Sequence, residues 1–156
     1  MLERLFPPTA NNDYRGHWLA LWVFVPITVV TLVRSGIHIF RADGGAQSIA
    51  TIPLDTYSDP AATAVILVFA LWGLSQLLLG LLYLVVLVRY RALIPLMYLT
   101  LILEYCGRLA LGAWKPLETP QTPPGARVTP ILIVLSLAMF ALSLRQRRNA
   151  NPTLKS

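Results

Sequence analysis

The sequence predicts an all-α fold in which four helices form a transmembrane bundle with both termini in the cytoplasm. Hydrophobic residues make up 56% of the 156 positions and charged residues only 13%, against about 25% charged residues in soluble domains. The apolar residues form four long runs, and a helix of about 20 such residues crosses a bilayer. Basic residues flank these runs, as is typical of membrane spans. We therefore expect residues 1–156 to form a single membrane domain.

The runs place the spans at about 17–40, 61–88, 92–114 and 128–144. The first is uncharged from Trp18 to Val33, and the second carries no charge at all. Helices are expected because lipid offers the backbone no hydrogen-bond partner. Pro26 is expected to bend the first span. Pro95 and Pro130 are expected in the first turns of the third and fourth spans, where a proline removes no helical hydrogen bond.

The connections between the spans differ in length and composition. Residues 41–60 form a long polar outer loop that contains glycine, proline and aspartate. Residues 89–91 form a tight turn, so the second and third spans are expected to be antiparallel neighbours. Residues 115–127 hold four prolines and are expected to form an extended outer loop.

Basic residues set the expected orientation. Eight of them lie on the side that holds both termini and the 89–91 turn, against three on the other side. The side richer in lysine and arginine is the cytoplasmic one. The eight are Arg4, Arg15, Arg89, Arg91, Arg145, Arg147, Arg148 and Lys155. The first span is interpreted as uncleaved, since it is longer than a signal-peptide core and no small-x-small site closes it.

Two charged residues interrupt the third span. Glu104 and Arg108 are four positions apart, so they share a helix face and can form an ion pair. Either charge alone costs about 2.5–3.5 kcal/mol to insert, so a partner or a function must offset that cost. Two interpretations stay open: a neutralised pair that locks helices together, or a site for a substrate, proton or ligand.

Arg34 and His38 repeat this spacing in the outer part of the first span. Arg34 is expected at the depth of Arg108, so both arginines can meet Glu104. One positive charge is then left over. An aspartate from residues 41–60 balances it, an anionic group binds it, or Arg34 extends to the membrane surface. His38 is expected to be a hydrogen-bonding or pH-sensitive residue at the outer interface.

The second span carries a stripe of small and polar residues, and the third adds one glycine. Gly73, Gly80, Tyr83 and Gly112 are expected to serve helix packing, because small residues let helices approach closely. Gln76 lies in the same stripe and either bonds across helices or lines a cavity. The candidate ligand-binding residues are Arg34, His38, Gln76, Glu104 and Arg108.

Several kinds of site are not expected. His17 and His38 are 21 residues apart on one helix, about 30 Å at 1.5 Å per residue, and Cys106 is the single cysteine. We therefore expect no metal site and no cofactor. Phosphate-binding loops and hydrolase elbows are absent from the sequence, and no catalytic residue is identified. Nucleic acid is not an expected partner, since the basic residues flank membrane spans.

The segment Glu104-Tyr-Cys-Gly107-Arg108, followed by Gly112 and a proline-containing loop, resembles the Glu-x-x-Gly-Arg segment of small four-span bacterial membrane proteins of unknown function. The resemblance covers about 20 of the 156 residues. It implies a similar four-helix fold in the bacterial cytoplasmic (inner) membrane and names no substrate.

Three functions remain open. The first is a non-enzymatic accessory or structural subunit that binds partner helices, lipid or a second copy of the chain. The second is a small transporter or ligand-binding bundle, in which Arg34 and Arg108 hold an anionic or lipid-like molecule and Glu104 neutralises charge or relays a proton. The third, an enzyme acting on membrane lipid, is least favoured, because no nucleophile, metal set or cofactor loop is found.

Overall fold

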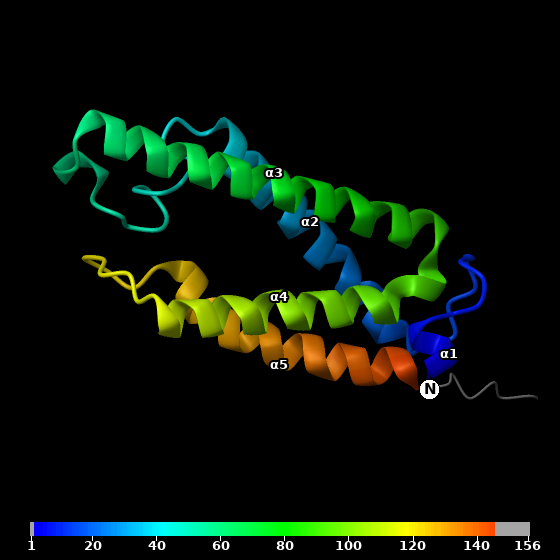
Figure 1. Ribbon diagram of the computed structural model, residues 1–156. Coiled ribbons are helices and arrows are strands. Elements are labelled where there is room, and N and C mark those ends of the chain that lie inside the picture. The colour runs from blue at the N-terminus through cyan, green and yellow to red at the C-terminus, as the bar shows by residue number, and fades with distance from the viewer. Residues whose placement is uncertain (1, 146–156) are drawn as a thin grey trace, which may run out of the picture.

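The computed structural model describes residues 2–145, and within that range its regular secondary structure consists of helices alone, with no strand (Figure 1). Its long helices are α2 (Trp18–Phe40), α3 (Asp59–Arg89), α4 (Ile94–Trp114) and α5 (Pro124–Leu144). Each of the four is long and apolar enough to cross a membrane, so the predicted four-helix fold is confirmed. Shorter elements are α1 (Leu2–Leu5) and the 3-10 helices η1 (Leu54–Thr56) and η2 (Arg91–Leu93). Arg147, Arg148 and Lys155, which entered the charge count, lie outside the described residues.

Prolines begin three of the long helices. Pro60, Pro95 and Pro124 each stand in the first two positions of a helix, where the fixed φ of proline suits the helix and its missing N–H is not needed. Because Pro124 begins α5, that helix starts four residues before the expected position 128. Pro130 therefore lies inside α5 and not in its first turn, which corrects the expectation.

The long helices pack as two hairpins. Helix α2 runs along α3 and α4 runs along α5, while α2 also contacts α5. Helices α3 and α4 are joined by the short η2 turn but separate from it and make few contacts (Figure 1). The expectation that these two are packed neighbours is therefore wrong. The turn makes them antiparallel, but the small residues of α3 face α2: the Cβ atom of an alanine at Gly73 would lie 2.7 Å from the His38 Cβ.

The larger apolar core is aromatic at its centre. The Phe24 ring meets the rings of Tyr83 and Tyr98 edge-on, at centroid distances of 5.3 and 5.5 Å. All three side chains are fully buried. Around them lie Ala20, Val86, Ile94, Met97, Leu101, Tyr105 and Met139. This core ties α2 and α3 to α4 and α5.

A second, smaller core lies under residues 41–58. Ala46, Ile52 and Leu54 are buried there, and Val65, Ile66 and Phe69 of α3 pack against them. Thr51 Oγ1 also donates a hydrogen bond to the Gln121 carbonyl at 2.7 Å, so the two long connections touch. The predicted outer loop 41–60 is thus folded onto the start of α3.

The N-terminal segment and the end of α5 lie at the same end of the bundle (Figure 1). The Arg4 guanidinium donates to the Leu144 carbonyl at 2.6 Å, and the His17 amide donates to the Leu142 carbonyl at 3.1 Å. We call this the proximal end, and the end that holds residues 41–58 and 115–123 the distal end.

Candidate functional site

Polar side chains from three helices meet in the distal half of the bundle. Arg34 comes from α2, Trp72 and Gln76 come from α3, and Glu104 and Arg108 come from α4. We call these five residues the polar centre. Four of them are among the predicted candidates, and they come from three different helices.

Glu104 and Arg108 form an ion pair one helical turn apart. Arg108 Nε donates to Glu104 Oε1 at 3.1 Å, and its Nη2 donates to the same oxygen. Both side chains are about one quarter exposed, at 23% for Glu104 and 25% for Arg108. The two charges of α4 therefore compensate each other without a further partner.

Arg34 has no such compensation. Its Nε donates to the Gln76 Oε1 at 2.8 Å, which is a neutral acceptor. All seven Asp and Glu residues of the sequence fall within residues 2–145, and none forms an ion pair with Arg34 there. Of the three alternatives for this charge, an aspartate of residues 41–60 is not the one found: Asp43 pairs with Arg41 at 3.3 Å, and neither Asp55 nor Asp59 forms an ion pair with Arg34. The polar centre thus carries one surplus positive charge.

Trp72 lies between the two arginines. The guanidinium carbon of Arg108 is 4.7 Å from the centre of the Trp72 ring, and that of Arg34 is 5.9 Å from it. The electron-rich face of an indole attracts cations, so Trp72 lets two like charges share one site. Sequence analysis missed this residue, although it lies four positions before Gln76 on the same face of the helix.

His38 lies in the wall of the site near the distal end of α2, where it is buried and hydrogen-bonded. It is 5% exposed, and its ring lies 4.5 Å from that of Trp72. Its Nδ1 lies 2.7 Å from the Gly44 carbonyl oxygen. A carbonyl oxygen can only accept a hydrogen bond, so Nδ1 carries the proton. His38 therefore links the 41–58 segment to α2 by this hydrogen bond, and its ring packs against that of Trp72.

Three buried polar atoms have no hydrogen-bond partner within the described part of the chain: Gln76 Nε2, Tyr83 Oη and Ser136 Oγ. A buried polar group left unpaired costs about 1–3 kcal/mol. Of the three, Gln76 belongs to the polar centre, so its Nε2 is available to donate to a molecule that enters there.

The small residues of the predicted stripe have two different environments. Gly73 and Gly80 are buried where α3 meets α2, and Tyr83 is fully buried in the core. Gly112 was expected to pack as well, but no atom lies within 4 Å of where its Cβ would be. That expectation is wrong for this chain, because α4 turns this position away from its neighbours.

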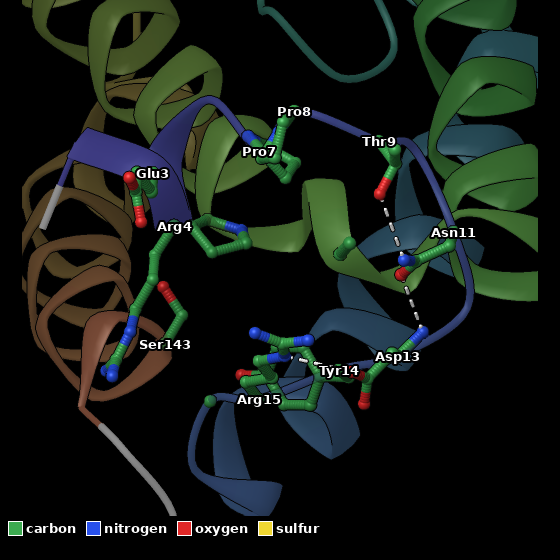
Figure 2. Close-up of a pocket in the computed structure, with 13 residues that line it drawn as sticks. Glu3, Arg4, Pro7, Pro8, Thr9, Asn11, Asp13, Tyr14, Arg15 and Ser143 are labelled. Atoms are coloured by element: carbon green, nitrogen blue, oxygen red, sulfur yellow. Dashed lines mark hydrogen bonds and ion pairs between the residues drawn. The ribbon is translucent and has the colours of Figure 1, made fainter.

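A second polar region lies at the proximal end, where a cavity of about 700 Å³ opens between the N-terminal segment and the bundle (Figure 2). Its lining holds two acidic residues, Glu3 and Asp13, and two basic ones, Arg4 and Arg15. Arg15 pairs with Asp13 at 2.9 Å, and the Arg4 guanidinium donates to the Leu144 carbonyl. Burial raises the pKa of the Tyr14 hydroxyl, which donates to the His17 carbonyl. Sequence analysis did not predict this cavity, since it exists only because residues 2–17 fold back. Because its acidic and basic lining residues are equal in number, it carries no surplus charge and is the weaker candidate.

Within residues 2–145, no group of three or more His, Cys, Asp or Glu side chains is placed to hold a metal ion. No family model, no curated protein and no solved structure matches the chain.

Proposed function

We propose that this multi-pass integral membrane protein binds the anionic group of a lipid or another acidic amphiphile at its polar centre. One observation carries the proposal: Arg34 lies in a membrane-spanning helix, its hydrogen-bond partner is neutral, and it forms no ion pair with a carboxylate within residues 2–145. Ionised groups inside a membrane normally face a charge partner or a functional site. A bound anion supplies the partner that the described residues do not.

The surroundings of Arg34 support such a ligand. The Glu104 and Arg108 side chains are partly exposed, and α3 and α4 separate toward the distal end. An amphiphile can thus bring its charged group to the guanidiniums from the surrounding lipid. Its chains would lie on leucines that are exposed on these helices, which include Leu71, Leu103 and Leu111.

This proposal changes the order of the functions that the sequence left open. An accessory subunit with a neutralised pair explains Glu104 and Arg108, but it leaves the Arg34 charge without a role. We further propose that the proximal end faces the cytoplasm, as the excess of basic residues indicates. The bacterial cytoplasmic membrane, which rests on the resemblance of the Glu104–Arg108 segment, also stays a proposal.

The test uses the full chain in nanodiscs of neutral phosphatidylcholine. Trp18, Trp22 and Trp114 are replaced by phenylalanine, so that Trp72 reports alone. Phosphatidylglycerol is then added in steps and the Trp72 emission is followed. We expect a saturable change that Arg34→Gln weakens by about tenfold or more.

Arg127→Gln is the matched control, because Arg127 is an exposed arginine in the first turn of α5 at the same distal end. It should bind as the parent chain does. Equal binding by the parent and Arg34→Gln, with the fold intact by circular dichroism, would overturn the proposal. A second result would also overturn it: the Trp72 emission changes when a copurifying membrane protein binds and does not change when phosphatidylglycerol is added. That result would support an accessory subunit.

A further inference from the structure

The charges of the polar centre can be counted residue by residue. Arg34 and Arg108 contribute two positive charges and Glu104 one negative charge, which leaves one positive charge. The remaining polar members, Trp72 and Gln76, are uncharged. A ligand with one negative charge therefore brings the site to neutrality, whereas a ligand with two leaves a net negative charge inside the membrane.

We propose that the polar centre selects singly charged oxyanions over doubly charged ones, and that Glu104 sets this selectivity. The inference rests on the proposed function and names the class of ligand: the phosphodiester of a lipid headgroup, or a carboxylate. A phosphomonoester is discriminated against, because near neutral pH it carries up to two negative charges.

The position of Glu104 supports this role. Its Oε1 accepts both hydrogen bonds from Arg108, so the carboxylate already occupies part of that guanidinium. An incoming anion therefore meets Arg34, which forms no ion pair within residues 2–145, and Arg108, two of whose nitrogens already donate to Glu104. Gln76 Nε2 is a buried donor with no hydrogen-bond partner among residues 2–145, and it can donate to the ligand without adding charge. The site thus offers several donors but only one uncompensated charge.

Removing the glutamate charge tests the inference. In Glu104→Gln the polar centre carries two positive charges. The Trp72-reporting chain is titrated with phosphatidylglycerol, with oleate and with phosphatidic acid at about pH 8, where a phosphomonoester is close to doubly charged. We expect the parent to prefer the two singly charged ligands. In Glu104→Gln, the affinity of phosphatidic acid relative to phosphatidylglycerol should rise by about tenfold or more. Dimethyl phosphate, a soluble phosphodiester, shows whether the headgroup alone is enough or whether acyl chains are needed.

A second variant tests whether the net charge of the polar centre sets the preference. Arg34→Gln combined with Glu104→Gln leaves Arg108 alone and restores a single positive charge, so the preference for singly charged ligands should return. Glu118→Gln is the matched control, since Glu118 is an exposed carboxylate in the distal loop and its loss should not change the preference.

An unchanged ratio in Glu104→Gln, with binding still dependent on Arg34, would refute the selectivity and leave the proposed function standing. Loss of the dependence on Arg34 would refute the proposed function itself. The two failures are therefore distinguishable.

Discussion

Arg34 and Arg108 lie against the same indole ring although they belong to helices α2 and α4, which are far apart in the sequence. Only Arg108 has a carboxylate partner. Two guanidiniums near one aromatic ring repel each other unless the ring and a negative charge compensate the repulsion. The chain supplies the ring and one negative charge, which leaves one positive charge without a partner; we propose that an anionic ligand supplies it.

Trp72 should therefore contribute both to the stability of the folded chain and to the affinity of the polar centre for its ligand. We expect Trp72→Leu to lower the free energy of unfolding in detergent by about 2 kcal/mol or more, since two cation–π contacts are lost. Binding of phosphatidylglycerol, measured by native mass spectrometry, should weaken as well. Trp114→Leu is the control, because Trp114 is 73% exposed at the end of α4 and contacts only the Lys115 ammonium among cations. Equal losses in both variants would contradict the role given to Trp72.

Two buried tyrosines should respond differently to the loss of their hydroxyl groups. Tyr98 donates to the Ala20 carbonyl at 2.7 Å, whereas the Tyr83 hydroxyl has no partner within residues 2–145. We expect Tyr98→Phe to lower the free energy of unfolding by about 1 kcal/mol. Tyr83→Phe should leave it unchanged or raise it. Both are measured by unfolding in mixed detergent micelles, and a larger loss in Tyr83→Phe would show that its hydroxyl is engaged within the protein.

The close contact between α2 and α3 depends on glycine. At Gly73 a Cβ would lie 2.7 Å from the His38 Cβ, an atom that moves only with its backbone. Gly73→Ala should therefore destabilise the chain by about 1–3 kcal/mol. Gly107→Ala is the control, because nothing lies within 4 Å of that position and alanine favours a helix by up to about 1 kcal/mol. Thermal unfolding in one detergent gives both values, and a stable Gly73→Ala would show that α2 and α3 separate at little cost.

The sequence was enough to predict the spans, because both signals are local: a span needs a continuous apolar run, and its backbone groups must hydrogen-bond within the same helix. It also identified Arg34, Gln76, Glu104 and Arg108, since polar residues stand out in apolar runs. Trp72 was missed for the opposite reason: a tryptophan in an apolar run carries no signal of its own. Its role appears only when helices from distant parts of the chain place cations on its ring.

The arrangement of the helices was less predictable. The short turn between α3 and α4 indicated neighbours, yet packing is decided by which faces allow close approach, and Gly73 and Gly80 turn that face of α3 toward α2. The 41–58 segment was expected to be a polar loop. Its few apolar residues, such as Ile52 and Leu54, are enough to hold it on α3.

The 41–58 segment should loosen in acid through Asp43. Partial burial raises the pKa of this carboxyl, but hydrogen bonds from Ser48 and from the Gly45 amide, together with the charge of Arg41, outweigh burial and lower the pKa to about 2. Its ordinary pKa is 3.8, so the ionised form favours the folded segment. This contribution is fully present above about pH 4 and is lost as the pH falls through about 2. The Gly45 and Ser48 amide resonances should therefore titrate with a midpoint near 2. Asp43→Asn should abolish this titration. Asp55→Asn is the control and should retain it, because Asp55 is an exposed aspartate of the same segment. A midpoint near 4 for these amides would show that the Asp43 hydrogen bonds do not form in solution.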